Sequence, residues 1–398
     1  MYKRLIVLVF SCLLLTWLVA CSNGEKDNET TEQENQPTDV EEIEEPVVEE
    51  EPEEPEEPET VTQEISIAAV GDILVHSSVY EDARTESGYD FMPMFENVKP
   101  FLDDTTITIA NQETMIGGTD LGLSTYPRFN SPYEVGDALK GIGVDVVSIA
   151  NNHTLDRGEQ AVQNAISHWE KIDMMYTGAY KDDLDRQNIR VMETEEGIDV
   201  AFLSFTYGTN GIPVPEGKDY LVNLIDQEKI VADIEAAKKL SDVVILSLHF
   251  GTEYQRMPNQ EQIDLVQLAA DHGVTAVIGH HPHVLQPVDW VEGKNGNKTF
   301  VSYSLGNFIS AQDEFYRQIG GVVQFDIEVT TTGEEKTVEV QDPKFLPTYV
   351  KYQNWSNYQV LPMYQLTDED LPNAAEHYEE IKQHMSQLVP ELTFIESE

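Results

Sequence analysis

Histidine, carboxylate and asparagine side chains gather at a few points of the chain, and each group directly follows an apolar run. These residues are Asp72, Glu113, Asn152, His153, His249, His281 and His283. Carboxylate oxygens and imidazole nitrogens are ligands that suit zinc, manganese and iron. A carboxylate that bridges two such ions, with further ligands on each side, can support hydroxide formation and an in-line displacement at phosphorus. The set therefore predicts a site for divalent metal, with one ion or two.

The prediction of a metal site depends mainly on how the histidines are grouped in the sequence. A single histidine is more often structural than a ligand, but five of the ten histidines lie in the segments Asn-Asn-His, Leu-His-Phe-Gly and Gly-His-His-Pro-His. The proline between His281 and His283 restricts the backbone and aims both rings from one turn. We expect His280 not to be a ligand, because the spacing of the other two histidines fits a metal better.

Several nearby polar residues could support these side chains. Glu253 and Tyr254 follow His249 and could orient it through a hydrogen bond. Asp156 could orient His153 in the same way, which would make the two a catalytic pair.

Two other polar residues have two interpretations each. Asn307 either supports the site or serves turn geometry, for which asparagine is well suited. Arg128, in Tyr-Pro-Arg-Phe, either binds an anionic group or is an ordinary surface arginine, and we favour the surface position.

Apolar segments of strand type alternate with segments of helical periodicity, which is typical of an α/β protein. Strands are expected at residues 65–70, 106–110, 144–150, 200–205, 243–248, 275–278 and 300–304, and helices at 158–172, 227–240 and 260–271. Later, more antiparallel strands are expected at 322–329 and 337–340, followed by an irregular aromatic stretch after Asp342. Ligands bind at the carboxyl ends of strands in open α/β sheets, so the polar groups should meet along one rim.

The composition excludes several classes of protein. Acidic residues outnumber basic ones by 73 to 24, and the formal net charge of −49 makes a nucleic-acid partner unexpected because phosphates would be repelled. Two cysteines, Cys12 and Cys21, are too few for a disulfide scaffold or a cysteine-rich zinc module. A hydrophobic content of 40% is enough for a sizeable folded core.

The first 62 residues are expected to lie outside the folded body. Residues 1–20 have the positive start and apolar run of a secretion signal, and Leu18-Val-Ala-Cys21 resembles the lipobox of bacterial lipoproteins. This resemblance implies a lipid anchor on Cys21 and a place on the extracellular face of the bacterial cell membrane. The alternative is an uncleaved anchor with an incidental cysteine.

The rest of the chain divides into three expected parts. Residues 21–62 are rich in glutamate and proline, which predicts a disordered tether or an acidic tail with no role. Residues 63–345 should form the main domain, and residues 346–398 an extension that packs on it.

Six motifs, in order along the chain, give the folded body a family resemblance. They are Gly71-Asp72, Asn111-Gln-Glu113, Ser148 to Gly158, His249 to Tyr254, Gly279 to His283, and Ser304 to Phe308. Over roughly residues 65 to 312 the sequence resembles the CapA-type proteins of poly-γ-glutamate capsule synthesis. That family is in turn similar to calcineurin-like metallophosphoesterases, which implies a metallophosphoesterase-like α/β/β/α sandwich with a two-metal site.

The resemblance implies a role for each motif residue. The metal ligands would be Asp72, Glu113, Asn152, His249, His281 and His283, with Glu113 as the bridging carboxylate. His249 and His281 would complete the site of one metal, and His283 that of the other. His153 would be the acid that protonates a leaving group.

The sequence departs from the phosphoesterase pattern at two places. Leu74 stands where that pattern has a histidine, and Asn-Gln-Glu113 replaces a Gly-Asp motif. His76, two residues beyond Leu74, either substitutes as a ligand or is simply exposed. The metal, expected to be manganese, iron or zinc, would therefore be present in one or two copies.

Three functions are compatible with these residues. The first is a cell-surface lipoprotein of poly-γ-glutamate capsule synthesis or export, with a metal-dependent hydrolase-like site for phosphoesters or γ-glutamyl amides. The second is a non-catalytic membrane-assembly partner that retains the fold, and the third is a secreted metal-dependent phosphoesterase unrelated to capsule. The first implies poly-γ-glutamate and membrane capsule synthase subunits as partners. An acidic body should repel that polymer unless metal ions or a local basic groove screen the charge.

Overall fold

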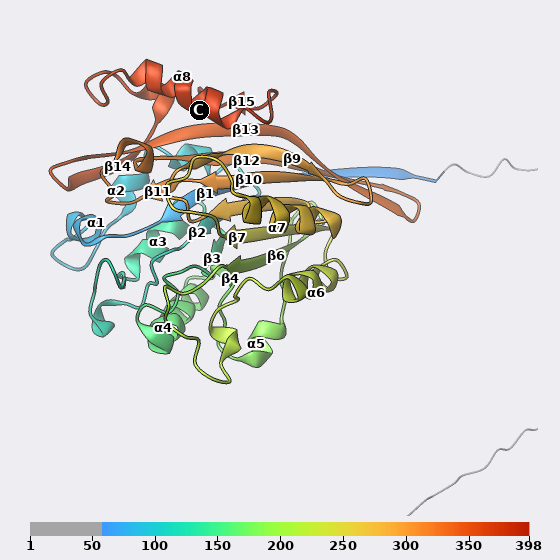
Figure 1. The fold of residues 1–398 in the computed structure, drawn as a ribbon, viewed down its shortest axis with the longest axis horizontal. Coiled ribbons are helices and arrows are strands. Elements are labelled where there is room, and N and C mark those ends of the chain that lie inside the picture. The colour runs from blue at the N-terminus through green and yellow to red at the C-terminus, as the bar shows by residue number, and fades with distance from the viewer. Residues whose placement is uncertain (1–57, 398) are drawn as a thin grey trace, which may run out of the picture. The chain divides into compact units, whose positions relative to one another are not determined.

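Two β-sheets stacked face to face form the centre of the molecule. The computed structural model describes residues 58 to 397 (Figure 1). The larger sheet has nine strands in the order β14-β13-β12-β1-β2-β3-β4, with β11 paired to β1 and β15 paired to β13. Its strands are β1 (Thr60–Ile73), β2 (Ile107–Asn111), β3 (Val146–Ser148), β4 (Met175–Thr177), β11 (Asn307–Ile309), β12 (Ile319–Thr332), β13 (Glu335–Gln353), β14 (Ser356–Pro362) and β15 (Thr393–Phe394).

The smaller sheet has six strands in the order β5-β6-β7-β8-β10-β9. They are β5 (Arg190–Glu193), β6 (Asp199–Thr206), β7 (Val243–His249), β8 (Ala276–His280), β9 (Leu285–Glu292) and β10 (Lys298–Leu305). The central strands β6, β7, β8 and β10 run parallel, while β5 and β9 pair antiparallel at the two edges. Parallel strands end on the same side, so β6, β7 and β8 deliver the residues that follow them to one edge.

Helices cover the outer faces of both sheets. They are α1 (Ser77–Asp82), α2 (Met92–Phe95), α3 (Glu134–Gly141), α4 (Gly158–Lys171), α5 (Asp183–Gln187), α6 (Gln227–Ala237), α7 (Gln260–Asp271) and α8 (Ala374–Met385). Short 3-10 turns occupy Lys99–Phe101, Thr119–Leu121, Asp219–Leu221, Phe315–Arg317 and Met363–Gln365. In Figure 1, α6 and α7 lie against the smaller sheet and α8 lies across β13.

Alternation along the strands separates three apolar cores. In β1, Ala68 and Val70 face the helices α1 to α4, whereas Ile67 and Ala69 face the second sheet. In β7, Ile245 belongs to the core between the sheets, and its neighbours on the strand face α6 and α7. A strand buried on both faces needs apolar residues at successive positions, as the sequence has. The predicted α/β/β/α sandwich is confirmed by these layers.

The helices α6 and α7 start at side-chain caps. Asp226 accepts a hydrogen bond from the backbone N–H of Lys229 at the start of α6. At α7, Asn259 accepts from the N–H of Gln262, and the Gln262 side chain accepts in return from the N–H of Asn259, each at 3.0 Å. Such a reciprocal cap satisfies two backbone donors that the helix leaves free. The predicted helix at 260–271 matches α7, whereas α6 ends at Ala237, before the expected residue 240.

The expected segment boundaries differ from the observed strands at both ends of the main domain. β1 begins at Thr60, inside the segment 21–62 that was assigned to the tether. β13 runs from Glu335 to Gln353 and crosses the boundary placed after residue 345. The expectation of an irregular stretch after Asp342 is wrong, because β13, β14, α8 and β15 occupy much of that part.

The expected secretion signal, Cys21 and most of the expected tether lie outside the described residues. Within residues 58 to 397, none of the helices has the length and apolar character needed to span a membrane. The lipid anchor, the position at the cell surface and the tether therefore stay predictions.

Candidate metal centre

The strand ends of both sheets bring the predicted polar residues to one place. All seven are buried, and the most exposed of them, His153, has an exposed fraction of 6%. Asp72 lies at the end of β1 and Glu113 just beyond β2 in the larger sheet, while His249 ends β7 and His281 follows β8 in the smaller one. The site therefore lies where the two sheets meet at their carboxyl ends, as the sequence predicts.

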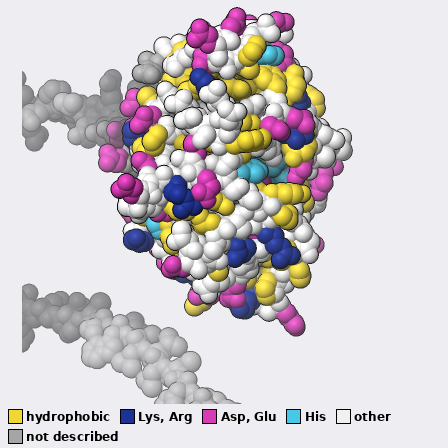
Figure 2. Space-filling view, turned by 90° about the vertical axis from the view of Figure 1, so that its left-hand side faces the viewer, with side chains coloured by type: hydrophobic (Ala, Val, Ile, Leu, Met, Phe, Trp, Pro, Cys, Tyr) yellow, Lys and Arg dark blue, Asp and Glu magenta, His cyan; other side chains and the backbone are white. Residues whose placement is uncertain are grey.

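Figure 2 views the molecule from the side toward which β6 and β7 point in Figure 1. Histidine side chains reach the surface near the middle of this face. Apolar and uncharged side chains surround them, and most acidic side chains lie farther out. The strongly negative charge of the chain is therefore not concentrated at the mouth of the site.

Glu113, His281 and His283 form the group best suited to hold a metal ion. Their ligand atoms all lie within 4.8 Å of one another. Glu113 Oε1 is 3.6 Å from Nε2 of His249 and 3.6 Å from Nε2 of His283. Glu113 thus stands between two histidines.

Three possible metal-binding atoms of this group make no hydrogen bond within the described residues. Both carboxylate oxygens of Glu113 and Nδ1 of His281 are buried and have no hydrogen-bond partner within the described residues. A buried carboxylate without a partner is costly, and a divalent cation would offset that cost. The residues present therefore fit a metal ion.

The turn that carries two of these histidines is held in an unfavourable backbone conformation. His281 and His283 have φ angles of 99° and 56°, in the left-handed region that non-glycine residues avoid. Each such residue costs on the order of 1–3 kcal/mol. Hydrogen bonds from the N–H of Tyr254 to the carbonyl of Pro282 and from the N–H of His281 to Asp72 hold the turn. Strain of this kind is typical of functional sites.

Asp72 is surrounded by hydrogen-bond donors. Its carboxylate accepts from Asn111 Nδ2 at 2.8 Å and lies 3.2 Å from His283 Nδ1. Burial alone would raise the pKa of Asp72, but its close contacts with the rings of His280 and His283, and the charge on those rings, outweigh burial and hold the pKa well below its ordinary value. Asp72 is therefore an anion within the site.

His280, which we expected not to be a metal ligand, lies close to Asp72. Its Nδ1 lies 3.4 Å from Asp72 Oδ1, and neither ring nitrogen has a hydrogen-bond partner within the described residues. His280 is the last residue of β8 and its side chain is buried. Its contact with Asp72 could not be inferred from the spacing of the histidines in the sequence.

Asn307 orients His283. The Nδ1–H of His283 donates to Asn307 Oδ1 at 3.0 Å, which leaves Nε2 directed toward Glu113. The Asn307 amide donates in turn to the carbonyl of Arg317 at 2.8 Å. Hydrogen bonds of this kind fix the tautomer of a metal-binding histidine, so the structure favours the supporting role over a simple turn role.

Metal binding should release protons. Burial alone would lower the pKa of His283, but the negative charges of Glu113 and Asp72 raise it to about 9. Burial, followed by the charge of Asp72, raises the pKa of Glu113 as well. Because His283 must lose its proton before Nε2 can bind a metal ion, we expect about one proton released per ion at pH 7, and an affinity that rises with pH toward 9. Titration calorimetry in buffers of different ionisation enthalpy measures this release; heats that do not depend on the buffer would contradict it.

Two asparagines, and not the expected Glu253 and Tyr254, orient His249. Its Nε2–H donates to Asn152 Oδ1 at 2.8 Å, and its Nδ1 is 3.4 Å from Asn111 Nδ2. The Tyr254 ring instead lies 6.3 Å from the ring of His283 and under the guanidinium of Arg317, at 3.6 Å. The loop after β7 turns away from His249, because Tyr254 adopts a φ of 66° and binds the carbonyl of Pro282.

Leu74 and His76 are held by contacts of their own. Leu74 is buried, and its backbone N–H donates to the carbonyl of Ile309. His76 Nδ1 accepts from the N–H of Ala311 at 3.3 Å, and its ring packs edge-on against Phe129. Within residues 58 to 397, Glu113, His281 and His283 are the histidine and carboxylate side chains whose ligand atoms converge closely enough to hold an ion, so one ion is better supported than two.

His153 and Asp156 form a buried pair beside the metal group. The Nδ1–H of His153 donates to Asp156 Oδ2 at 2.7 Å. The same carboxylate oxygen accepts from the backbone N–H of Phe129 at 2.7 Å, and the Phe129 ring packs edge-on against His153. With Nδ1 held, Nε2 is the nitrogen available to exchange a proton with a bound molecule.

Two residues of the loop after β6 escaped the sequence analysis. Asn210 accepts from Asn152 Nδ2 at 3.2 Å, and its own Nδ2 is 3.4 Å from His153 Nδ1. Tyr207 lies over the site, with its ring 4.6 Å from that of His281. Burial and the charges of Glu253 and Glu113 raise the pKa of Tyr207 to about 12, so it stays a neutral hydrogen-bond donor. The segment Tyr-Gly-Thr-Asn-Gly after a strand was the available signal.

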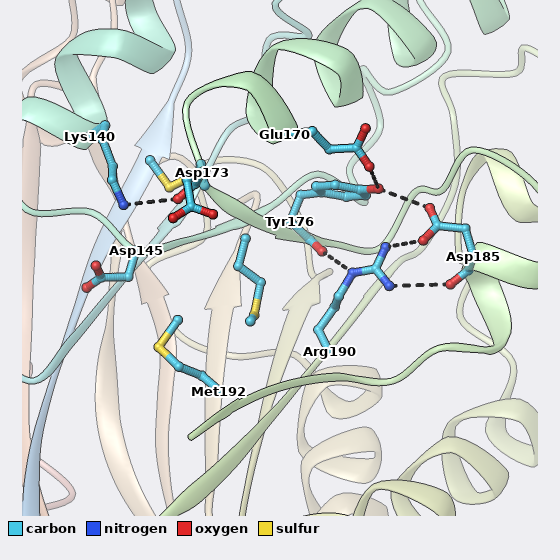
Figure 3. Close-up of a pocket in the computed structure, with 10 residues that line it drawn as sticks. Lys140, Asp145, Glu170, Asp173, Tyr176, Asp185, Arg190 and Met192 are labelled. Carbon is cyan, nitrogen blue, oxygen red and sulfur yellow. Dashed lines mark hydrogen bonds and ion pairs between the residues drawn. The ribbon is translucent and has the colours of Figure 1, made fainter. Parts of the chain in front are cut away.

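The molecule has another cavity, away from the histidine-rich site, whose charged groups bind one another. It has a volume of about 570 Å³ and lies among α3, α4, α5, β4 and β5 (Figure 3). Its charged groups bind one another: Arg190 contacts Asp185 at 2.6 Å, and the Tyr176 hydroxyl donates to Asp185 at 3.0 Å. Lys140 donates to the carbonyl of Asp173. Because these groups are already satisfied, we assign the function to the histidine-rich site.

An α/β/β/α sandwich with a buried histidine–carboxylate centre at its strand ends is the arrangement that the motif resemblance predicted. Residues 66–312 match the family of the bacterial capsule synthesis protein PGA_cap, and the chain belongs to that family. The resemblance inferred from the motifs is thereby confirmed.

Named relatives are similar in sequence and extent. The PGA biosynthesis protein CapA of Bacillus subtilis is 27% identical over 72% of this chain and 74% of its own length. The capsule biosynthesis protein CapA of Bacillus anthracis is 29% identical over 67% of this chain and 64% of its own length. Among solved structures, the calcineurin-like phosphoesterase YfkN from Bacillus subtilis is 16% identical, with a TM-score of 0.39 over 71% of this chain and 91% of its own. A similarity that weak adds nothing to the argument from the layers and the site.

Proposed function

We propose that this protein is a cell-surface factor of poly-γ-glutamate capsule synthesis or export that works through a divalent-metal, hydrolase-like centre. The observation that carries the proposal is the buried Glu113, both of whose oxygens lack a hydrogen-bond partner in the part of the chain that the structure describes, while two histidines stand 3.6 Å away. The names of the relatives support the capsule assignment, since both describe capsule or PGA biosynthesis. Lipidation of Cys21 would hold the protein at the membrane, near capsule synthase subunits.

The proposed reaction is hydrolysis of a γ-glutamyl amide or a phosphoester. A bound manganese, iron or zinc ion would polarise the substrate and supply an activated water. Glu113, His281 and His283 would hold it, with Asp72, His249 and Asn152 around them. His153, kept in one tautomer by Asp156, would give a proton from Nε2 to the leaving group. Tyr207 would cover the site and exclude water.

Metal content tests this proposal directly. The full chain, purified in detergent without chelator, is expected to carry about one divalent ion per molecule, because one group of ligands is assembled. Elemental mass spectrometry counts it. Two ions would indicate that the residues around Asp72 complete a second position. A chain that takes up neither manganese, iron nor zinc would contradict the metal centre.

The non-catalytic assembly partner remains the second candidate. Leu74 favours it, because an apolar buried side chain occupies the place of a phosphoesterase ligand. On that view the fold and a metal could persist without turnover. Capsule formation that survives loss of His153 but not of Glu113 would support this candidate.

A further inference from the structure

A pocket of about 330 Å³ opens beside the His153–Asp156 pair and carries charges of both signs. Tyr126, Arg128, His153, Asn210 and Glu253 contribute to its lining. Arg128 comes from the segment before α3 and Glu253 from the loop after β7, so parts of the chain that are distant in sequence form the pocket. The proposed reaction does not yet use either residue.

The segment that carries Arg128 is fixed to the catalytic pair. The N–H of Phe129 donates to Asp156, and the Phe129 ring centroid lies 4.7 Å from that of His153. The N–H of Arg128 itself donates to the carbonyl of Thr125 at 3.2 Å. The backbone at Arg128 is therefore fixed beside the catalytic pair, while its side chain is exposed and lines the pocket.

Arg128 and Glu253 line the same pocket but do not neutralise each other. Within residues 58 to 397, neither takes part in an ion pair of 4.0 Å or less. Asp156, the other carboxylate there, binds His153 and the N–H of Phe129 through Oδ2, and its Oδ1 is buried away from solvent without a hydrogen-bond partner within the described residues. One cation and one anion therefore remain to face a ligand across the pocket.

We propose that this pocket binds an α-amino acid group, with Arg128 taking the α-carboxylate and Glu253 the α-ammonium. The inference rests on the proposed function and specifies its substrate as the amino-terminal end of a γ-linked glutamyl chain. In such a chain each unit carries a free α-carboxylate, but the terminal unit alone also carries an ammonium group on the same carbon. The planar guanidinium can bind the carboxylate through two parallel hydrogen bonds.

The proposed contacts also explain how an acidic protein could bind an acidic polymer despite the repulsion between their charges. An α-amino acid group is neutral overall, so it enters without the repulsion that an interior unit meets. Glu253 would repel the carboxylates of interior units and thereby select the chain end.

Binding of two matched ligands tests the proposal. The probes are γ-glutamyl-glutamate with a free amine and the same dipeptide with an acetylated amine, titrated into the full, metal-loaded chain by calorimetry. The wild type is expected to bind the free amine about tenfold or more tightly than the acetylated form, because a charge-assisted contact is lost. Glu253→Gln should abolish that preference, and Arg128→Gln should weaken both ligands. Lys294→Gln, in the exposed β9–β10 turn, is the control and should change neither.

The outcomes separate this inference from the proposed function. Equal binding of the two dipeptides to the wild type, or tighter binding of both to Glu253→Gln, would replace the amino acid pocket by a simple anion site. No change in Arg128→Gln would also overturn the proposal. If the wild type binds glycine or lysine with the expected response to both variants but binds no γ-glutamyl compound, recognition of an α-amino acid stands and the capsule polymer fails. Metal content should be unchanged in both variants.

Discussion

Replacing Glu113 by glutamine is expected to remove the metal and leave the fold intact. Glutamine has nearly the same shape, so the buried space stays filled, but it lacks the negative charge that stands between His249 and His283 at 3.6 Å from each. Loss of a direct carboxylate ligand should weaken metal binding more than the roughly 10- to 100-fold typical of outer residues. Elemental mass spectrometry of the purified variant should find little or no ion.

Thermal unfolding with and without metal measures the same change independently. A metal at 100 times its Kd stabilises the folded state by about 2.7 kcal/mol, a gain that the wild type should show and Glu113→Gln should lack. The variant without metal should be at least as stable as the wild type without metal, because an unpartnered buried carboxylate has been removed. Glu64→Gln, an exposed change on β1, is the matched control and should keep the metal response. A Glu113→Gln protein that still gains stability from metal would contradict a ligand role.

The closeness of the polar residues could be predicted, because parallel strands run in the same direction and end at the same edge of a sheet. Asp72 and His249 are both delivered by the ends of strands, whatever the details of the loops. The apolar runs before them are long enough to be recognised as buried strands. The contacts that orient the His249 side chain were harder to predict. Glu253 and Tyr254 follow His249 in sequence, but Tyr254 has a φ of 66° and the chain turns toward Pro282 instead.

Residues whose role depends on contacts between distant segments were not predictable. Asn210 reaches His153 from another loop, and His280 meets Asp72 across the gap between two sheets. Neither contact has a signature in local periodicity. Arg128 is exposed, as expected, but the pocket that it also lines could not be foreseen, because segments far apart in the chain form it.

The end of the domain was misjudged because prolines interrupt its strand. Pro343 and Pro347 lie in β13, where proline argues against a central strand. Pairing of β13 with β14 starts only at Thr348, whereas Pro347 pairs with β12 alone. A missing N–H is tolerated on the side of a strand that has no partner there, so the long strand continues through both prolines.

Replacing His153 by glutamine should abolish turnover without affecting the metal. If His153 gives a proton to the leaving group, the rate should fall by about 10² to 10⁴. Asp156→Asn should lower the rate as well, because an amide no longer holds the Nδ1–H form of the ring. Neither residue belongs to the group of Glu113, so metal content should stay at the wild-type value. Release of glutamate from poly-γ-glutamate, or of nitrophenol from an aryl phosphodiester, measures the rate.

His168→Gln is the matched control for this loss, because His168 also pairs with an aspartate, Asp137, at 2.9 Å but lies away from the metal group. It should leave turnover unchanged. A His153→Gln protein with the wild-type rate would remove His153 from the reaction, even if Glu113→Gln is inactive. If the wild type turns over neither substrate, and cells carrying His153→Gln still make capsule while cells carrying Glu113→Gln do not, the metal centre serves assembly. The two variants together therefore decide between a hydrolase and a partner that retains the fold, because only the hydrolase needs a proton at the leaving group.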